Sequence, residues 1–471
     1  MNKTAKRWYD YYETLAPKYK GYYKRFSYYW NDSIKYFNYF ITEDQSILQI
    51  GCGHGETLAK IKGSKKTGVD FSPALIVIAK ESFPDIQFEL MDAHELRLKD
   101  QYDVIILSNV VGCFDNVLEV LKLVRKVSHE RTKVFITGYN RVWQPILKIG
   151  ELFGVKKRSP EQNWLGKGDI ENLAYLAGFE VFRTNRRVLL PIYIPLISTL
   201  FNKYIARLPL INIFCLNQLV VARIAERSSE VEYSVSVVIP ARNESGNIER
   251  AIKETPKLGS HTEIIFVEGN STDDTWEEVQ RIEKKYRDSH DIKITQQPGK
   301  GKYDAVKHGY AMASGDIMMI LDGDLTVPPE DLTKFYDALT SGKGDFINGS
   351  RLVYPMEDEA MRFLNMLGNK FFSYVFSWLL DQPIKDTLCG TKVMFREDYE
   401  KLAANRKFFG DFDPFGDFDL LFGSYKLNLK IIDLPIRYRD RTYGDTNISR
   451  FRHGMILIRM VLFAMNKIKF S

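Results

Sequence analysis

Short apolar segments alternate along the chain with stretches in which apolar residues recur at helical spacing. In the first half the apolar segments are SILQI (46–50), KKTGVD (65–70), IQFEL (86–90), YDVIIL (102–107) and KVFITG (133–138). In the second half the alternation restarts with YSVSVVIP (233–240), TEIIFVEG (262–269) and DIMMILDGD (316–324). Continuous apolar strands that alternate with helices are typical of parallel sheets covered by helices on both faces. The pattern therefore predicts two α/β domains.

The polar stretch ERSSEVE interrupts the alternation, and we place the linker there, at residues 226–232. We therefore expect an N-terminal segment 1–45, a first domain 46–225 and a second domain 233–471. The N-terminal segment is unusually rich in aromatic residues. It either forms a lid over a bound ligand or covers an edge of the sheet. A lid would place one of its tyrosines, Tyr11, Tyr12 or Tyr19, near that ligand.

The composition excludes a disordered or fibrous chain and a nucleic-acid-binding protein. The chain has 471 residues, of which 45% are hydrophobic and 27% charged, enough apolar material for large cores. Its 66 basic and 60 acidic residues give a net charge of only +6, which does not indicate nucleic acid. Four scattered cysteines without a CxxC pair are typical of reduced thiols. These features predict a cytoplasmic protein.

Two apolar segments are too short or too interrupted to span a bilayer. LLPIYIPLISTL (189–200) contains two prolines and begins an insertion between the last two strands of the first domain. We expect this insertion to cap an acceptor pocket, with contact to lipid as the alternative. MILIRMVLFAM (455–465) mixes apolar and basic residues, as interfacial helices do. Peripheral contact with the inner face of a membrane is therefore a candidate property.

A glycine-rich loop follows the first strand and contains Gly51, Gly53 and Gly55. Glycine allows the tight turn and the close approach of backbone to ligand that such loops need. Asp70 ends the next strand, at the spacing expected for a carboxylate that binds ribose hydroxyls. The pattern is GxGxG, with Glu56 where a dinucleotide loop has its third glycine. The loop therefore predicts a nucleoside cofactor and disfavours a nicotinamide one.

Residues 46–223 resemble the class I S-adenosylmethionine-dependent methyltransferases, which have a Rossmann-like sheet. The motifs that carry the resemblance are ILQIGCGHGE, GVDFS, MDAHEL and DVIILSNVV. The resemblance implies that the glycine loop faces the methionine part of S-adenosylmethionine and that Asp70 binds its ribose. It also implies that Asp92 and Ala93 flank the adenine and that Ser108 and Asn109 lie near the sulfonium.

The second half carries the pair Asp322 and Asp324 at the end of a short apolar strand. Two carboxylates one residue apart form an oxygen-rich site that suits a hard cation, Mg²⁺ or Mn²⁺. Such a cation bridges the two phosphates of a nucleotide diphosphate and neutralises charge as the phosphate leaves. The pair therefore predicts a metal site that binds a nucleotide diphosphate sugar.

Residues 233–446 resemble glycosyltransferase family 2, which has the GT-A fold. The motifs are VVIPARNE, VEGNSTDDT, PGKGKYDAVKHG, LDGDLTVP, NGSR and DTLCGTKVMF. Many members carry two consecutive aspartates where this chain has Glu268-Gly269, so the identity of the nucleotide stays open, although Glu268 is long enough to reach the base. The resemblance implies that Pro240, Asn243 and Glu244 hold the nucleoside and that Lys300 and Lys302 lie near the phosphates.

Two hypotheses describe the acceptor of the sugar. FGDFDLLFG resembles the family's acidic motif, in which Asp417 would be the general base of an inverting transfer to a glycan hydroxyl. Alternatively, NGSR, DTLCGTK and RTYGDTNISRF resemble dolichol-phosphate mannose synthases, whose polyprenyl-phosphate acceptor is already anionic. That acceptor needs cations instead of a base, and the candidates are Arg351, Arg441, Arg450 and Arg452.

Together these features predict a bifunctional enzyme that transfers a methyl group and, with a metal, a sugar. One alternative is a glycosyltransferase whose methyltransferase-like domain binds cofactor without catalysis. A second alternative is a membrane-surface scaffold that only senses nucleotide ligands.

Overall fold

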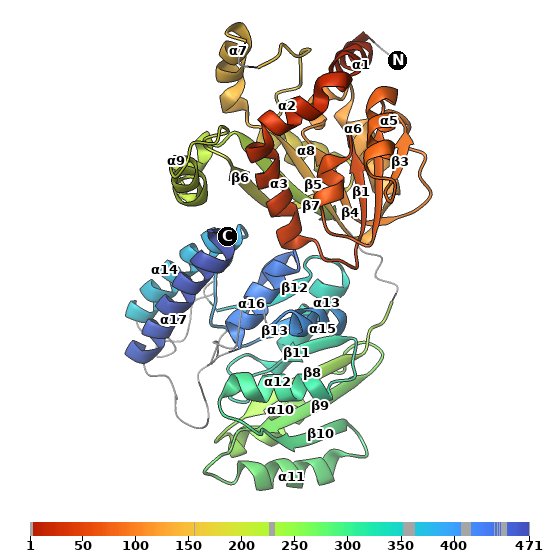
Figure 1. The fold of residues 1–471 in the computed structure, drawn as a ribbon. Helices are drawn as coiled ribbons and strands as arrows, with labels where there is room; N and C mark the ends of the chain where they lie inside the picture. The colour runs from red at the N-terminus through yellow and green to blue at the C-terminus, as the bar shows by residue number, and fades with distance from the viewer. Residues whose placement is uncertain are drawn as a thin grey trace. The chain divides into compact units, whose positions relative to one another are not determined.

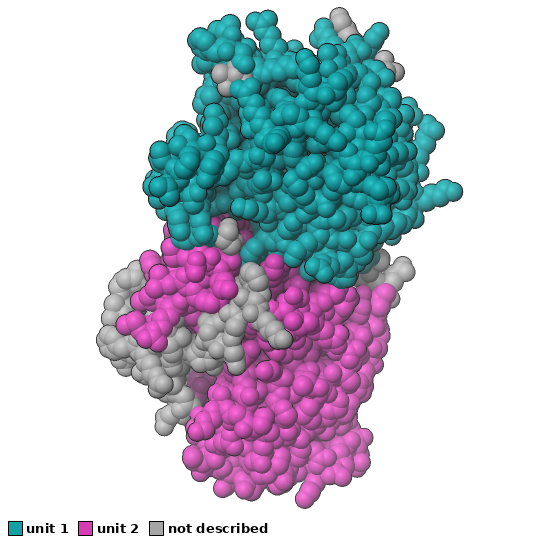
Figure 2. Space-filling model, viewed as in Figure 1, with its two compact units in different colours: residues 1–226, 470 teal, residues 227–469, 471 magenta. Residues whose placement is uncertain are grey.

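Two seven-stranded sheets, each flanked by helices, form the computed structural model of the chain (Figure 1). The structure describes residues 3–154, 156–225, 231–351, 363–406, 416–437, 439, 441, 443 and 450–470. The chain divides into two compact units, residues 1–226 with 470 and residues 227–469 with 471 (Figure 2). Most of the expected linker and the side chains of Arg450 and Arg452 lie outside what is described.

The first unit contains the sheet in the order β3-β2-β1-β4-β5-β7-β6. Its strands are β1 (Ser46–Ile50), β2 (Lys65–Asp70), β3 (Gln87–Leu90), β4 (Tyr102–Ser108), β5 (Ser128–Tyr139), β6 (Phe179–Arg187) and β7 (Asn217–Ile224). Its helices are α1 (Lys3–Leu15), α2 (Tyr19–Arg25), α3 (Ser27–Phe40), α4 (Glu56–Lys60), α5 (Pro73–Ser82), α6 (Val117–Lys126), α7 (Gln144–Leu152), α8 (Lys167–Leu176) and α9 (Ile197–Thr199).

The second unit contains the sheet in the order β10-β9-β8-β11-β13-β12-β14. Its strands are β8 (Val235–Ala241), β9 (Thr262–Glu268), β10 (Asp291–Gln296), β11 (Ile317–Ile320), β12 (Phe346–Ser350), β13 (Lys392–Phe395) and β14 (Ile431–Pro435). Its helices are α10 (Ile248–Glu254), α11 (Thr275–Tyr286), α12 (Lys302–Met312), α13 (Leu332–Thr340), α14 (Phe363–Leu380), α15 (Arg396–Ala404), α16 (Asp417–Lys426) and α17 (Arg450–Ala464). The two α/β folds expected from the sequence are confirmed.

Both sheets are mixed, whereas the apolar pattern predicted wholly parallel ones. β7 is antiparallel to β5 and β6, and β13 is antiparallel to β11 and β12. The chain between β6 and β7 forms only short helical turns and does not cross back along a face of the sheet. Because β7 re-enters the sheet from the end where β6 leaves it, the two strands run in opposite directions.

The aromatic N-terminal segment forms three helices that pack on the first unit. On α3, Phe37 is fully buried and its ring lies 5.6 Å from the ring of Phe135 on β5. On α1, the ring of Tyr12 packs edge-on against Phe71, which follows β2. Part of the segment therefore covers the sheet, and part lies beside the end of β2.

A glycine lets α12 lie close to the second sheet. A Cβ atom on Gly309 would lie 2.4 Å from Cγ1 of Val238 on β8 and 3.0 Å from Cγ2 of Val267 on β9. These distances are shorter than van der Waals contact, so a larger residue would force the helix away from the sheet.

Within the described part of the chain, no helix combines the length and the apolar character needed to cross a membrane.

We expect Gly309→Ala to lower the free energy of unfolding by about 1–3 kcal/mol, because the added methyl group overpacks the contact between α12 and the sheet. Gly168→Ala on α8 is the matched control, since a Cβ atom there meets nothing within 4 Å. That change is expected to raise the free energy of unfolding by up to about 1 kcal/mol. Urea denaturation followed by circular dichroism measures both. Equal effects of the two changes would contradict the close approach.

Candidate functional site

The glycine loop after β1 adopts backbone angles that favour glycine at all three positions. Gly51, Gly53 and Gly55 have φ values of 71°, 58° and 83°. A Cβ atom on Gly51 would lie 2.6 Å from Cγ2 of Val110, and one on Gly55 would lie 2.7 Å from Cζ of Phe88. The loop is therefore fixed in shape by its own neighbours, with backbone N–H groups at the carboxyl end of the sheet.

Asp70, at the end of β2, holds this loop in place. Its Oδ2 accepts a hydrogen bond of 2.8 Å from the N–H of Gly53, and its Oδ1 accepts one of 3.0 Å from the N–H of Ser72. Burial raises the pKa of Asp70 to about 6, although these backbone N–H groups act in the opposite direction. Each carboxylate oxygen has further lone-pair capacity, so the carboxylate can still accept a hydrogen bond from a ribose hydroxyl.

The other residues expected at the cofactor follow β3 and β4, at the same edge of the sheet. Asp92 caps the turn Ala93–Glu95, because its Oδ1 accepts a hydrogen bond from the N–H of His94. Ala93 is buried in the core, and Ser108 accepts a hydrogen bond of 3.4 Å from the hydroxyl of Thr137. Parallel strands end at one edge, so β1, β2, β3 and β4 bring these residues to one side of the sheet.

Residues of the N-terminal helices complete this edge. The ring of Tyr19 contacts His54, and its hydroxyl lies 3.5 Å from where a Cβ atom on Gly53 would be. Of the three tyrosines considered as lid residues, Tyr12 and Tyr19 both lie close enough to the Asp70 carboxylate for its charge to act on them. Tyr12 and Tyr19 therefore lie near Asp70, the residue expected to bind the ribose.

Sequence reasoning missed two further residues here. Glu13 on α1 accepts hydrogen bonds from the hydroxyl of Ser72 and the N–H of Ala74, at the start of α5. The hydroxyl of Tyr29 on α3 donates a hydrogen bond of 2.9 Å to Oδ1 of Asn109, which has a φ of 54°. No local pattern marks either residue, because both contacts join segments more than fifty residues apart.

In the second unit, Asp322 and Asp324 follow β11 and each contacts a cation of the chain. Oδ1 of Asp322 lies 2.5 Å from Nζ of Lys302, which begins α12. Oδ2 of Asp324 lies 2.6 Å from Nη2 of Arg441. Asp324 also accepts a hydrogen bond from the hydroxyl of Thr326. The sequence analysis expected Lys302 near the phosphates of the nucleotide, and in the structure its ammonium contacts Asp322.

Glu244 shares Arg441 with Asp324. Its Oε1 lies 3.3 Å from Nη1 of Arg441, and its Oε2 accepts a hydrogen bond from the side chain of Asn247. Burial raises the pKa of Glu244 to about 7, while Arg441 and Asn247 act to lower it. Glu244 and Asp324, which the sequence separates by eighty residues, therefore lie at one point of the sheet edge.

Burial alone would raise the pKa of Asp322, but three cations more than offset it and hold the pKa below its usual value. They are Lys302, Lys392 and Arg351. Burial alone would lower the pKa of Lys302, but the carboxylates of Asp322, Asp417 and Asp324 outweigh it and raise the pKa. These mutual effects show that acidic and basic groups from several elements are gathered around Asp322.

The residues present fit a divalent cation only in part. Asp322 and Asp324 supply the hard oxygen donors that Mg²⁺ and Mn²⁺ prefer, and Mg²⁺ commonly takes one or two carboxylates together with substrate phosphates. Among the described residues, no group of three or more His, Cys, Asp or Glu side chains could hold a metal ion. A cation here would therefore depend on phosphate oxygens and would replace Lys302 and Arg441 on the two carboxylates.

The loops after β8 and β9 are bound to each other through the residues expected at the nucleoside. Oδ1 of Asn243, which has a φ of 56°, accepts a hydrogen bond from the N–H of Thr272. Glu268 accepts hydrogen bonds from the N–H of Ser271 and from the side chain of Gln296, so it is engaged within the protein. The carbonyl oxygen of Pro240 would lie 2.9 Å from a Cβ atom on Gly323, so the DGD turn passes close to β8.

Of the other residues predicted for the second site, Arg351 and Asp417 form ion pairs within the protein, and Lys300 is exposed. Arg351 donates hydrogen bonds of 2.7 and 2.8 Å to the two carboxylate oxygens of the buried Asp386. Oδ1 of Asp417, at the start of α16, lies 2.9 Å from Nζ of the fully buried Lys392. Lys300 has an exposed side chain beside the start of α12. Lys392 and Asp386 are the partners of Asp417 and Arg351. The sequence analysis named neither as a site residue.

Comparison with known proteins identifies the two units separately. Residues 48–132 match the family model described as a methyltransferase domain, and residues 236–403 match the model of glycosyl transferase family 2. A dolichol-phosphate mannosyltransferase of Pyrococcus furiosus is 30% identical over 225 residues, which are 46% of this chain and 59% of that protein. The chain thus spans less than two thirds of that relative's length.

Two further relatives are also named as sugar transferases. A dolichyl-phosphate beta-glucosyltransferase of Saccharomyces cerevisiae is 28% identical over 266 residues, 50% of this chain and 77% of that protein. Glycosyltransferase AglJ of Haloferax volcanii is 27% identical over 226 residues, 48% of this chain and 69% of that protein. The chain therefore joins a region that matches a methyltransferase domain to a region that matches glycosyl transferase family 2.

Proposed function

We propose that the protein is a bifunctional enzyme that transfers a methyl group from S-adenosylmethionine and a sugar from a nucleotide diphosphate sugar to a polyprenyl-phosphate acceptor. The observation that carries the sugar transfer is the meeting of Glu244, Asp322 and Asp324 with Lys302 and Arg441 at the end of β8 and β11. Such a set of opposite charges can exchange its internal ion pairs for contacts with a charged ligand.

In the first domain, the protein's part is to bind and to orient. S-adenosylmethionine would supply a methyl group that its sulfonium already makes electrophilic. Asp70 would accept hydrogen bonds from the ribose, the backbone of Gly51 and Gly53 would face the amino-acid part, and Asp92 and Ala93 would flank the adenine. Because positioning alone can supply several kcal/mol of such a reaction's barrier, the chain needs no nucleophile of its own.

In the second domain, the chain supplies charge and alignment. A divalent cation held by Asp322 and Asp324 would supply Lewis-acid stabilisation of the leaving nucleotide. Lys302 and Lys300 would contact phosphate oxygens, and Arg441, released from Asp324, would do the same. Pro240, Asn243, Glu244 and Glu268 would shape the nucleoside site through the paired loops after β8 and β9.

A phosphate acceptor is favoured over a glycan hydroxyl by two observations. Lys302, Lys392 and Arg351 all lower the pKa of Asp322, so positive charge that favours an anionic acceptor is concentrated around it. Oδ1 of Asp417, the candidate base, is held in an ion pair by the buried ammonium of Lys392, so this oxygen is already engaged within the protein. The polyprenyl-phosphate names of the relatives point the same way.

The pH dependence of cofactor binding tests the role of Asp70. Its pKa of about 6 keeps the carboxylate ionised above that pH, and the ionised form is the better acceptor for ribose hydroxyls. Affinity for S-adenosylhomocysteine is therefore expected to be constant above pH 7 and to fall by roughly tenfold per pH unit below 6. Calorimetric titration measures it. Asp70→Asn should bind weakly at every pH, and Asp100→Asn, at an exposed carboxylate, should keep the wild-type profile; a flat wild-type profile would contradict the role.

Removal of one candidate metal ligand tests the second site. Asp322→Asn is expected to lower the rate of sugar transfer or nucleotide sugar hydrolysis by about a hundredfold or more, because the charge that holds the cation is reduced. Asp316→Asn, at the opposite end of β11, is the matched control and should retain activity. Chelation should abolish the wild-type activity and Mn²⁺ should restore it. Full activity after exhaustive chelation would exclude the metal.

Asp417→Asn distinguishes the two acceptor hypotheses. With a phosphate acceptor there is no proton to remove, so we expect transfer to a short-chain polyprenyl phosphate to fall less than about tenfold. A general base would contribute about 10²–10⁴-fold, and its loss would appear in full with a hydroxyl acceptor. Steady-state kinetics with both acceptors measure this, and the melting temperature shows whether Lys392 tolerates the change. A loss above a hundredfold in a folded variant would support the glycan hypothesis.

A further inference from the structure

The segment 188–216, which joins β6 to β7, turns its large apolar side chains outward. Leu196 and Leu210 are 85% and 79% exposed. Nine more apolar or aromatic side chains of the segment are between 43% and 59% exposed: Ile192, Tyr193, Ile194, Ile197, Leu200, Tyr204, Leu208, Ile213 and Phe214. The sequence analysis expected this insertion to cap an acceptor pocket, with contact to lipid as the alternative. In the structure, the ring of Tyr193 contacts Tyr28 on α3, and the large apolar side chains of the segment are substantially exposed.

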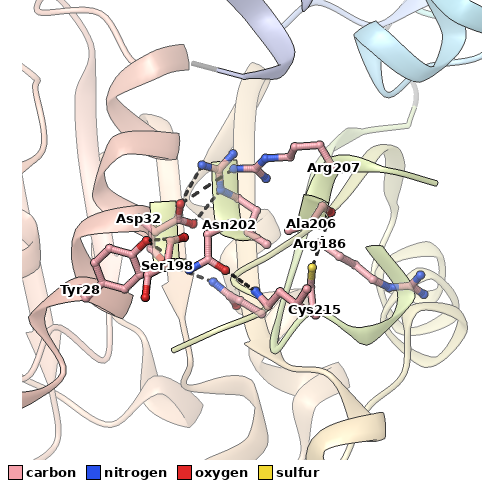
Figure 3. Close-up of polar contacts among 12 residues, drawn as sticks. Tyr28, Asp32, Arg186, Ser198, Asn202, Ala206, Arg207 and Cys215 are labelled. Atoms are coloured by element: carbon pink, nitrogen blue, oxygen red, sulfur yellow. Dashed lines mark hydrogen bonds and ion pairs between the residues drawn. The ribbon is translucent and has the colours of Figure 1, made fainter. Parts of the chain in front are cut away.

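The inner side of the same segment includes polar side chains. Asn202 is only 6% exposed, and its Oδ1 accepts hydrogen bonds of 2.7 and 2.8 Å from the N–H groups of Leu189 and Leu190. Its Nδ2 donates to the carbonyl of Leu190 and to the hydroxyl of Tyr28 on α3. Figure 3 shows Asn202 beside Tyr28. The buried side of the segment therefore includes polar side chains, while most of its large apolar side chains face outward, unlike an ordinary surface loop.

A buried group of charges anchors the segment to α3 and β6. Asp32 accepts hydrogen bonds of 2.7 and 2.9 Å from Nε and Nη2 of Arg187, and Arg207 lies 3.9 Å from the same carboxylate (Figure 3). Arg207 is 4% exposed. Buried ion pairs and hydrogen bonds of this kind are costly to break one at a time. The apolar side chains therefore cannot turn inward without breaking this network.

Helix α7 extends the apolar surface. Ile146, Ile149 and Phe153 recur at helical spacing and are all exposed, with Phe153 at 75%. On the other side of the helix, Leu147 packs against a small buried cluster that includes Val188. The indole N–H of Trp143, just before α7, donates a hydrogen bond of 2.7 Å to the carbonyl of Phe214, which joins α7 to the insertion.

The charges around these elements are almost all basic. The chain has no aspartate or glutamate between residues 181 and 225. Three exposed cations lie on the same elements as the apolar side chains: Arg141 just before α7, Lys148 on α7 and Lys203 in the insertion. On and beside α7, Glu151 is paired with Lys156, and Glu161 lies further along the chain. The excess of positive charge complements an anionic surface.

We propose that residues 189–214 and α7 form a docking surface for the interface of an anionic lipid bilayer. The outward side chains would enter the boundary between headgroups and acyl chains, and the exposed cations would contact lipid phosphates, as in interfacial helices. This inference concerns the methyltransferase unit and does not rest on the proposed transfer reactions.

A second copy of the chain fits this surface less well. A two-fold interface brings the same patch of both copies together, so the exposed cations would face one another. Like charges at an interface oppose association, whereas anionic headgroups neutralise them. The charge pattern therefore favours lipid as the occupant.

Vesicle binding of the full chain tests the proposal. We expect binding to vesicles of phosphatidylcholine with phosphatidylglycerol and much weaker binding to phosphatidylcholine alone. The double variant Leu196→Ser with Leu210→Ser is expected to lower the partition constant by about tenfold or more, since two apolar side chains no longer leave water. Leu176→Ser is the matched control, because Leu176 is 53% exposed on α8, which ends near the start of β6 and away from the insertion.

A double lysine variant, melting temperatures and light scattering distinguish lipid binding from unfolding and from contact between copies. Lys148→Glu with Lys203→Glu should weaken binding only to the vesicles that contain phosphatidylglycerol, and melting temperatures should be unchanged in all variants. Unchanged binding of the folded double leucine variant would overturn the proposal. Light scattering without lipid gives a second test. A dimer that the leucine changes abolish would also overturn the proposal, because the surface would then be a contact between copies of the chain. Neither outcome depends on methyl or sugar transfer.

Discussion

Carboxylates at the carboxyl ends of parallel strands must be neutralised or hydrogen-bonded, because burial without partners is costly. The two domains meet this requirement differently. In the first, Asp70 is satisfied by backbone N–H groups of the glycine loop and of the start of α5. In the second, Asp322, Asp324 and Glu244 are satisfied by the side-chain cations Lys302 and Arg441. The shape of each site follows from this difference.

Because backbone N–H groups hold Asp70, the glycine loop of the first domain is already in a fixed conformation. Gly51, Gly53 and Gly55 take left-handed backbone angles, and neighbouring side chains leave no room for a Cβ atom at two of them. The N-terminal helices then close over the same edge, where Tyr19 contacts the loop residue His54 and Glu13 caps α5. A ligand that enters such a site adds hydrogen bonds to groups that already hold their positions, so little ordering is required.

In the second domain, side-chain cations occupy the carboxylates, so a ligand cation would have to replace them. Any cation that binds Asp322 and Asp324 must take the place of an ammonium and a guanidinium, so its affinity reflects only the difference between the two arrangements. The released Lys302 and Arg441 carry positive charge that phosphate oxygens can take up. Coupling of this kind would make the proposed metal and nucleotide binding mutually dependent, because the metal would release Lys302 and Arg441 and the phosphate oxygens would take up their charge.

The sequence by itself determined the features that local chain geometry encodes. The glycine loop, Asp70 and the DGD turn could be predicted because each stands directly at a strand end, and the apolar pattern indicated both α/β domains. Tertiary structure alone decided the direction of β7 and β13, the contacts of Tyr29 and Glu13, and the burial of Asn202 and Arg207 within residues 188–216. It also decided which cation meets which carboxylate: Arg441 and Asp324 are 117 residues apart along the chain. The physical reason is that local propensity and periodicity act over a few residues, whereas strand direction and ion pairing depend on segments that meet only in the folded protein.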